Sequence, residues 1–574
     1  MLTKQVEVTA EFSLSKLYRF AITILGRDSG FYWLAMLYGI GISVLFLATP
    51  VSVQILVNTV ANTGVMTQLF LLTFCLFVFL LLSALLNALR IQLMDVFQRK
   101  FYSRMVSEIS LSALFAANPF FQDEHQGGLF NRYFDIVIVQ KNLPNLLVSG
   151  FTIFLQSVVG FVLVSMYHPL FLMFNLIVAL IIWIIWTAWG RRAIRSAVMV
   201  SHKKHEMATW LQSLGQSNGF FKTDATIDEA LRMTDYMTRQ YIDKHVHHFR
   251  HHFAQTVGFL LLYAVSSAAL LGLGGWLVIN GELTLGQLVA AELVLSAAFY
   301  GVSYLGIYLA YFYELCAAVD ELSLFLNVEQ EDLSGDIDVF DGDSRLKFVA
   351  CRGNEHGMTH RIDIETKKGA RVMAVAETPA VQREFCNLLK RHIRPKAGYI
   401  TLGGVDISSL YATTLRKQIR VIDRPSTVDM TVREYLRLNS SEPGSEKDLE
   451  LLRLVGLEQV LMSLDDGLDT RLATTGWPLT TTETFLLKLA AAIIATPRIL
   501  VLSQLFDVMP TEQIARALDY LQSKTDCTVI YFSSRDQDLG FDTYLYLGTD
   551  KQEIYPTFEA MRAVVGEEAL RNQA

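Results

Sequence analysis

The stretch with the clearest potential for chemistry is GARVMAVAETPAVQREFCNLL, residues Gly369 to Leu389. It begins as a short apolar strand and ends as a helix, an arrangement in which a phosphate-binding loop carries G-x-x-x-x-G-K-[ST]. In such a loop the glycines let backbone N–H groups wrap the phosphates, and the lysine and hydroxyl supply a charge and a Mg²⁺ ligand. Here the loop reads AETPAVQRE, in which Pro379 lacks an N–H and Glu377 and Glu384 are anionic. These residues predict the frame of a nucleotide site without its binding groups, a site that its own carboxylates could occupy.

Histidines form a second group, in the run KHVHHFRHHF. His245, His248 and His252 share one face of a helix, and His247 and His251 share another. Three histidines at this spacing could hold a transition metal ion or respond to acidification near about pH 6.5. The alternative, which we favour, is a weakly basic cytosolic helix that approaches lipid headgroups.

A single carboxylate, Glu292, lies inside an apolar run. An ionisable residue within the membrane is a functional candidate by default. Glu292 lies about two turns from the outer end of its run, so an interfacial or snorkelling position is an equal alternative.

The composition is that of a membrane protein. The chain has 574 residues, of which 52% are hydrophobic, and a mean hydropathy of +0.33. Its net charge is −7, with basic residues beside the apolar runs of the first half and most of the acidic surplus in the second, which does not favour nucleic-acid binding. The five cysteines show no CxxC spacing, so neither a disulfide framework nor a zinc site is indicated.

Six apolar runs are long enough to cross a bilayer. We place them at 31–57, 66–92, 147–167, 170–189, 256–279 and 286–310. The long connections between them contain Lys and Arg whereas the short ones contain neither, so the long connections and both termini are predicted to be cytosolic. We interpret residues 1–30 as a cytosolic tail with an amphipathic helix on the membrane, without a cleaved signal peptide. The spans make up a transmembrane domain of residues 31–328.

The pattern changes in the second half of the chain. An acidic, Gly-containing linker is predicted at 329–344. From 345 to 574, short β-type runs such as RVMAVA and CTVIYF alternate with helical ones, which predicts a soluble α/β domain.

Several segments of the chain are similar to segments of a known protein family. INGELTLGQLVA and YELCAAVDELSLFLNVEQE flank the last span, and RPKAGYITLGGVDISSL lies in the soluble part. With the order of elements, they resemble the ATP-binding-cassette (ABC) exporters, particularly bacterial type I secretion exporters of the RTX-toxin kind. The resemblance implies a membrane-embedded homodimer or heterodimer in the bacterial inner membrane, powered by Mg²⁺-ATP in the family. It also places two cytosolic coupling helices in PFFQDEHQGGLFNRYFDI and SLGQSNGFFKT, where Phe120, Phe121, Phe220 and Phe221 would need cover.

The family's nucleotide-site motifs fall on residues of other types in this chain. In the Walker A loop the glycines fall on Ala376, Pro379 and Val381, the lysine on Gln382, and the Ser/Thr pair on Arg383 and Glu384. The signature falls on Leu479, Thr480, Thr481, Thr482 and Glu483. The Q-loop glutamine falls on Asp423, the Walker B aspartate on Ser503, the catalytic glutamate on Gln504, the switch histidine on Ser534, and the adenine-stacking aromatic residue at about Gly353.

These replacements predict that the chain neither hydrolyses ATP nor requires it as a cofactor. Loss of one positioned base costs roughly 10²- to 10⁴-fold in rate, and loss of a charge clamp is comparable. In the family each ATP lies between the Walker A of one subunit and the signature of the other, so this chain would impair both sites even beside an intact partner.

Three functions stay open at this point. The first is a pseudo-transporter that acts as a scaffold, regulator or partner in a secretion or export system. The second is an exporter of a peptide, protein or lipid-like substrate that uses atypical nucleotide binding. The third is an ATP-independent channel or carrier, for which Glu292 and the histidine run are the indications.

Overall fold

The computed structural model describes residues 14–60, 66–117, 126–353, 361–439 and 446–563. The chain divides into two compact units, Met1–Gln330 and Glu331–Ala574. We call the first the membrane unit and the second the cassette, and each is described by itself.

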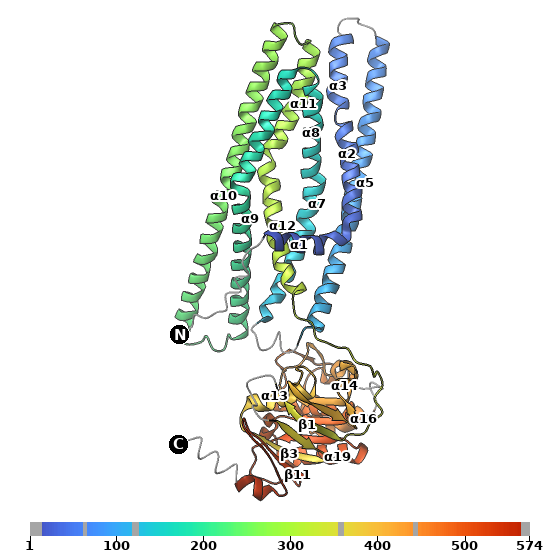
Figure 1. The fold of residues 1–574 in the computed structure, drawn as a ribbon, viewed down its shortest axis with the longest axis vertical. Coiled ribbons are helices and arrows are strands. Elements are labelled where there is room, and N and C mark those ends of the chain that lie inside the picture. Colours follow the sequence, from blue (N-terminus) through green and yellow to red (C-terminus); the bar gives the residue numbers. More distant parts are fainter. Residues whose placement is uncertain (1–13, 61–65, 118–125, 354–360, 440–445, 564–574) are drawn as a thin grey trace. The chain divides into compact units, whose positions relative to one another are not determined.

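The membrane unit consists of helices, several of them very long (Figure 1). They are α1 (Leu14–Leu25), α2 (Ser29–Leu45), α3 (Ala48–Ile55), α5 (Met66–Leu114), α7 (Asp135–Asn145), α8 (Phe151–Ser165), α9 (Pro169–Gln216), α10 (Asp224–Ile279), α11 (Leu285–Ser303) and α12 (Leu305–Leu326). Short helical turns at Gly26–Asp28, Leu56–Val60, Gln126–Phe134 and Leu146–Gly150 join some of them. Helix α1 is amphipathic and lies across the long helices.

Six helical stretches in the described part of the chain are long and apolar enough to cross a membrane, which confirms the six predicted spans. They are Leu17–Asn58, Met66–Leu114, Leu129–Ser165, Pro169–Gln216, Asp224–Ile279 and Leu285–Ser303. The sixth differs in one respect from the prediction. The predicted run 286–310 is interrupted at Tyr304, where α11 ends and α12 begins.

Glycines let helices of the membrane unit approach closely. A Cβ atom on Gly160 of α8 would lie 2.6 Å from Val294 Cγ1 of α11, and one on Gly301 of α11 would lie 2.3 Å from Ile153 Cγ2 of α8. Small residues at such contacts are typical of membrane helices, because association there depends on close packing of the helices against each other.

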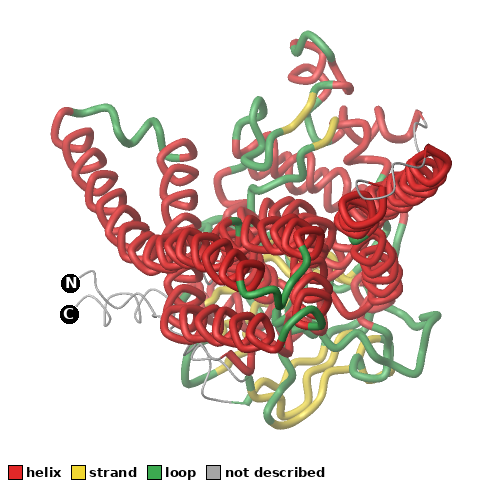
Figure 2. The backbone as a smooth tube through the Cα atoms, turned by 90° about the horizontal axis from the view of Figure 1, so that it is seen from above, coloured by secondary structure: helices red, strands yellow, loops and turns green. Residues whose placement is uncertain are grey.

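The described residues of the cassette form three sheets, whose strands are yellow in Figure 2. The largest has the order β12-β11-β3-β10-β9-β6, in which only the pairing of β12 with β11 is antiparallel. The others have the orders β2-β1-β4-β5 and β7-β8. The strands are β1 (Leu346–Arg352), β2 (Ile362–Glu365), β3 (Arg371–Ala376), β4 (Ala397–Leu402), β5 (Val405–Asp406), β6 (Ile419–Ile422), β7 (Met430–Thr431), β8 (Arg471–Leu472), β9 (Ile499–Leu502), β10 (Thr528–Phe532), β11 (Thr543–Leu547) and β12 (Gln552–Tyr555).

Helices cover the parallel sheet and complete the α/β domain. They are α13 (Pro379–Leu389), α14 (Ala412–Gln418), α15 (Val432–Arg437), α16 (Glu446–Leu454), α17 (Glu458–Ser463), α18 (Thr481–Ile494) and α19 (Thr511–Lys524), with short turns at Gly467–Asp469 and Gln504–Val508. Strands β9 and β10 are buried along their whole length, as expected for central strands of a parallel sheet.

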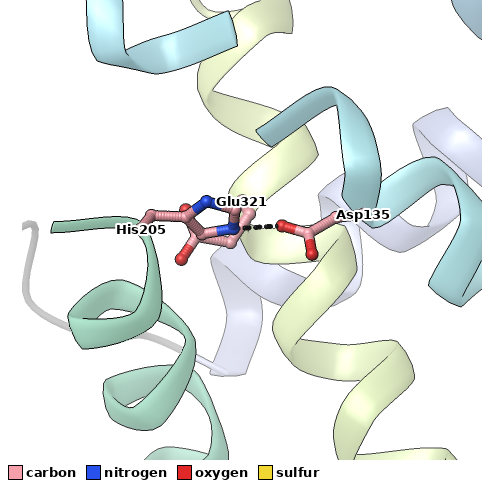
Figure 3. A group of neighbouring side chains, drawn as sticks. All are labelled: Asp135, His205 and Glu321. Carbon is pink, nitrogen blue, oxygen red and sulfur yellow. Dashed lines mark hydrogen bonds and ion pairs between the residues drawn. The ribbon is translucent and has the colours of Figure 1, made fainter. Parts of the chain in front are cut away.

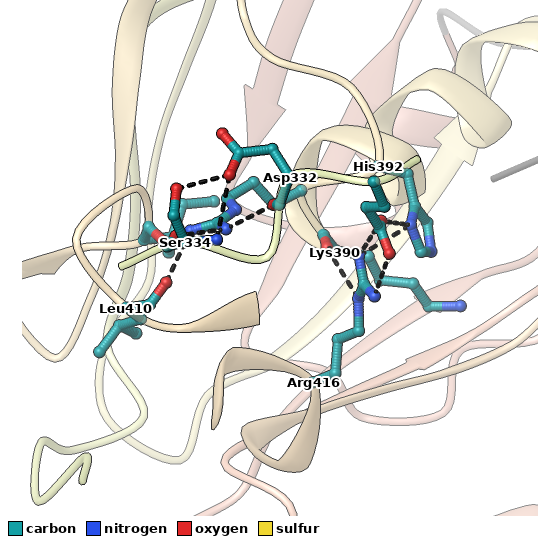
Figure 4. Close-up of polar contacts among 9 residues, drawn as sticks. Asp332, Ser334, Lys390, His392, Leu410 and Arg416 are labelled. Carbon is teal, nitrogen blue, oxygen red and sulfur yellow. Dashed lines mark hydrogen bonds and ion pairs between the residues drawn. The ribbon is translucent and has the colours of Figure 1, made fainter. Parts of the chain in front are cut away.

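Residues 331–334 of the predicted linker are held within the cassette. The Arg391 guanidinium donates to the carbonyl oxygens of Asp332 (2.9 Å), Ser334 (2.7 Å) and Leu410 (2.6 Å). Figure 4 shows Asp332, Ser334 and Leu410 gathered around these bonds. Beside them, Glu331 forms an ion pair with Arg416 and lies 3.0 Å from Nδ1 of His392. Burial raises the pKa of Glu331, but hydrogen bonds from His392 and Arg416 outweigh burial and lower the pKa to about 2.

Candidate functional site

The connection between β3 and α13 contains only two residues, Glu377 and Thr378. Thr378 caps α13: its Oγ1 accepts a long hydrogen bond from the Val381 N–H (3.4 Å), and its carbonyl accepts from the Gln382 N–H (3.4 Å). A phosphate-binding loop places four residues between its glycines and leaves such N–H groups to the ligand. Here α13 begins two residues after β3, and the N–H groups of Val381 and Gln382 both bond to Thr378.

The carboxylates of Glu377 and Glu384 each have protein neighbours in this region. Glu377 Oε2 accepts a hydrogen bond of 2.6 Å from the Thr549 N–H, just after β11. Glu384 is fully buried, and a Cβ atom on Gly353 would lie 1.6 Å from its Oε1. Glu384 therefore fills the space beside Gly353, the position to which the resemblance assigns the adenine-stacking residue.

Residues at the signature position form a helix cap. Thr480 precedes α18, and the Glu483 carboxylate accepts from the Thr480 N–H (2.7 Å) while Thr480 Oγ1 accepts from the Glu483 N–H (3.3 Å). This reciprocal pair is a capping box, which satisfies two of the N–H groups at the helix start. Thr481 is exposed and Thr482 is half-buried beside the cap.

At the ends of β9 and β10 the predicted counterparts of the catalytic residues do come together. The Gln504 side-chain amide donates to Ser534 Oγ. Ser503 is buried, and its Oγ has no hydrogen-bond partner among the described residues.

Asp507, which the sequence reasoning did not single out, organises this edge of the sheet. Its carboxylate accepts from the Ser533 hydroxyl (2.8 Å) and the Ser534 N–H (2.8 Å). Arg535 donates to the Phe506 (3.1 Å) and Asp507 (3.0 Å) carbonyls. These bonds tie the loops after β9 and β10 to each other.

Asp423 follows β6 and lies near a partly buried cation. Burial lowers the pKa of Lys488, and the negative charge of Asp423 partly offsets this effect. The Lys488 ammonium donates to the Arg424 carbonyl at 2.7 Å. The neighbourhood of the Q-loop counterpart is therefore an internal polar contact between β6 and α18.

In the membrane unit, the three histidines predicted to share a metal ion have different polar or aromatic partners, although the rings of His248 and His252 also stack on each other with centroids 6.3 Å apart. His245 stacks on the ring of Tyr241, His248 Nδ1 lies 3.0 Å from Ser196 Oγ, and His252 Nε2 lies 2.8 Å from the Gly306 carbonyl oxygen. The rings of His247 and His251 contact each other, with centroids 4.8 Å apart. Metal binding by His245, His248 and His252 stays a prediction.

Glu292 and Arg90 are charged side chain types that lie within the apolar helices. Glu292 Oε1 accepts from Ser296 Oγ (2.7 Å), and its buried Oε2 has no partner among the described residues. Arg90 of α5, not singled out from the sequence, is only 3% exposed and donates to Thr152 Oγ1 and to Asn87 Oδ1 (2.8 Å). In the described part of the chain Arg90 has no carboxylate within ion-pair distance.

The predicted coupling helices fall only partly on described residues. Phe120 and Phe121 lie outside the described residues. Phe220 is 70% exposed, and the ring of Phe221 lies 6.3 Å from that of Trp210.

The described residues combine six membrane-length helices with a C-terminal α/β cassette, an arrangement that also occurs in a solved exporter. The fold matches a solved bacterial Atm1-family ABC exporter with ATP bound, with a TM-score of 0.78 over 98% of this chain and 99% of that one, at 14% identity. This likeness establishes the fold.

Sequence relatives are consistent with the same class. The chain is 26% identical over 262 residues to the uncharacterized ABC transporter ATP-binding protein YwjA of Bacillus subtilis (44% of this chain, 45% of the relative). It is 27% identical over 255 residues to the alpha-hemolysin translocation ATP-binding protein HlyB of Escherichia coli O157:H7, and 27% over 257 residues to the leukotoxin translocation ATP-binding protein LktB of Mannheimia glucosida (44% of this chain and 35% of the relative in each case). The matches span less than half the length of these relatives, and no family model matches the chain. The chain therefore has the fold of an ABC exporter, with six helices of membrane-spanning length, and its sequence is similar to ABC transporter and toxin-translocation ATP-binding proteins.

Proposed function

We propose that this chain is an exporter-type membrane protein that does not hydrolyse ATP and that acts as a scaffold, regulator or partner in a secretion or export system. It works as a homodimer, or as a heterodimer with another ABC-type chain, in the bacterial inner membrane. Both termini and the cassette are on the cytosolic side.

The observation that carries this proposal is the internal capping of α13 and α18. A helix N-terminus binds phosphate through N–H groups that lack partners and through the positive end of the helix dipole. Thr378 accepts from amides of α13, and Thr480 with Glu483 caps α18. The Glu483 carboxylate also places negative charge at the α18 N-terminus, where a phosphate would be repelled.

Both halves of a composite site are affected in the same chain. If one subunit supplies α13 and the other supplies α18, then an intact partner completes neither site with this chain. Turn glycines away from the phosphates are nevertheless retained, since Gly398, Gly404 and Gly467 all have positive φ (76°, 82° and 53°). The motif residues are replaced where the resemblance places the nucleotide, whereas the turn glycines are retained. This contrast supports the proposal that the fold serves a role other than ATP hydrolysis.

The test is a calorimetric titration of Mg²⁺-ATP into the purified chain in lipid nanodiscs, beside an active exporter of the same fold as the control. We expect no heat of binding up to about millimolar ATP, and no phosphate release above background. Micromolar binding would contradict the absence of a nucleotide site. Phosphate release would then support the second function, an exporter with atypical nucleotide binding.

Glu292 and Arg90 favour one further candidate, an ATP-independent channel or carrier. Both are ionisable groups in membrane-length helices, and each retains a buried polar atom without a hydrogen-bond partner among the described residues. Ion or solute flux into vesicles without ATP, abolished by Glu292→Gln but not by Glu282→Gln in the neighbouring loop, would support this candidate. Absence of flux from wild-type vesicles would exclude it for the solutes tested.

A further inference from the structure

Three helices of the membrane unit bring buried side chains of metal-ligand type together, at positions outside the predicted spans. Asp135 begins α7, His205 lies in α9, and Glu321 lies in α12 (Figure 3). Asp135 and Glu321 are fully buried, and His205 is 4% exposed. One ligand atom from each residue lies within 4.8 Å of the others.

The two carboxylates are held in the same way. Asp135 Oδ1 accepts from Lys204 Nζ (2.8 Å), and Glu321 Oε2 accepts from Arg132 Nε (2.6 Å). Each carboxylate thus has one oxygen fixed by a cation and a second oxygen available to the cluster. Such outer contacts orient the ligands in protein metal sites.

Only one of these two oxygens lacks a partner in the described part of the chain. Asp135 Oδ2 lies 2.5 Å from His205 Nε2, whereas Glu321 Oε1 is buried and has no hydrogen-bond partner among the described residues. His202 Nε2 lies 3.9 Å from Glu321 Oε1, beyond hydrogen-bond distance, and this nitrogen already lies 3.0 Å from Asp320 Oδ2. A buried carboxylate oxygen without a partner carries a large desolvation cost.

We propose that Asp135, His205 and Glu321 bind one divalent transition metal ion, of which Zn²⁺ is the representative, and that the ion links α7, α9 and α12. One imidazole nitrogen and two carboxylate oxygens form a donor set suited to Zn²⁺, Mn²⁺ or Fe²⁺, whereas Ca²⁺ and Mg²⁺ prefer oxygen donors alone. The site lies entirely within the membrane unit, so it does not depend on the proposed function of the cassette.

A proton is the alternative to a metal ion. Three carboxylates (Asp135, Asp320 and Glu321) face two permanent cations, Arg132 and Lys204. A charge on His205 or His202 would balance this group without any metal ion. The experiment must therefore distinguish metal binding from protonation.

The full chain is purified through a tag without histidines, reconstituted in lipid nanodiscs, stripped with a chelator and dialysed against Zn²⁺. Elemental analysis after desalting should give about one tightly held Zn²⁺ per chain, because one set of metal-ligand side chains converges among the described residues. We expect His205→Gln and Glu321→Gln to lose this ion, with at least a tenfold weaker affinity in competition with a chromophoric chelator. The matched control is His247→Gln, since His247 is an exposed histidine in another helix.

A second measurement does not rely on any variant. Co²⁺ added to the stripped wild-type chain should produce the visible absorption of a low-coordinate His and carboxylate site, and Zn²⁺ should abolish it. Less than about one-tenth of an ion per chain together with no Co²⁺ band would overturn the proposal in favour of a protonated cluster. Retention of Zn²⁺ by His205→Gln, with loss in His248→Gln or His252→Gln, would overturn it in favour of the histidine run.

Discussion

Gln504 and Ser534 contact each other at the ends of neighbouring parallel strands, where the resemblance places a catalytic glutamate and a histidine. Neither side chain can serve as a base at neutral pH. The surrounding bonds of Asp507 and Arg535 occupy the space with the chain's own polar groups. The chain's own hydrogen bonds therefore fill the position of the catalytic residues. Replacing single side chains there would not by itself restore ATP hydrolysis.

The first prediction concerns restoration of the motif residues. In the variant Gln382→Lys, Ser503→Asp, Gln504→Glu, we expect no ATP hydrolysis above the wild-type background. The reason is that the two-residue connection of Glu377 and Thr378 still provides no loop to wrap phosphate. Phosphate release in nanodiscs is the measurement. If the triple variant hydrolyses ATP, then the residue types and not the loop geometry were limiting.

The second prediction concerns Glu331 and pH. Its pKa is about 2 in the folded chain and close to 4.5 when the chain is unfolded. A lowered carboxyl pKa stabilises the fold above about pH 4.5, and this stabilisation is lost as the pH falls from about 4.5 to 2. We expect Glu331→Gln to lower the free energy of cassette unfolding at pH 7 by about 1.5–3 kcal/mol, and to flatten its pH dependence in that window.

Scanning calorimetry of the wild-type chain and of Glu331→Gln between pH 2 and 7 tests this second prediction. Glu365→Gln is the control, because Glu365 pairs with Lys347 on the exposed surface, where solvent and salt screen an ion pair and it contributes little to stability. Equal effects of the two substitutions would show that the Glu331 cluster does not fix the linker.

At the scale of elements, the N-terminus of α18 contributes to the stability of the cassette and also carries the proposal that nucleotide does not bind. The capping box of Thr480 and Glu483 should be worth about 1 kcal/mol. We expect Thr480→Ala to destabilise the cassette by about that amount in denaturant unfolding, whereas the exposed neighbour Thr481→Ala changes stability by less than about 0.5 kcal/mol. An identical effect of both substitutions would mean that the cap contributes nothing.

Sequence patterns predicted these elements unequally. The six spans could be found because about 20 apolar residues in a row are rare outside membrane helices. The dipeptide Thr378-Pro379 is a recognisable helix start, so the short connection before α13 could also be predicted. The break at Tyr304 could not be predicted, because the residues on both sides of it are equally apolar. Asp135, His205 and Glu321 escaped detection because tertiary packing alone brings three distant helices together.

At the scale of the whole molecule, two units with separate cores share one chain. If the cassettes do not bind nucleotide, then ATP cannot supply the energy that draws two of them together in a dimer. We expect the distance between spin labels on Met462→Cys, a position 74% exposed, to be unchanged by Mg²⁺-ATP with vanadate. Pulsed dipolar spectroscopy in nanodiscs, with Cys75→Ser to remove the exposed native cysteine, makes the measurement. An active exporter labelled at the equivalent place should show a shift, and a similar shift in this chain would contradict the proposed function.

The internally capped starts of α13 and α18 have a consequence for cell physiology. An ordinary exporter changes its conformation with the ratio of ATP to ADP, so starvation silences it. If this chain binds no nucleotide, as proposed, then it would behave identically in a growing cell and in a starved one. Its activity would follow the abundance of its partners, which makes gene expression and membrane insertion the levels at which a cell could control it.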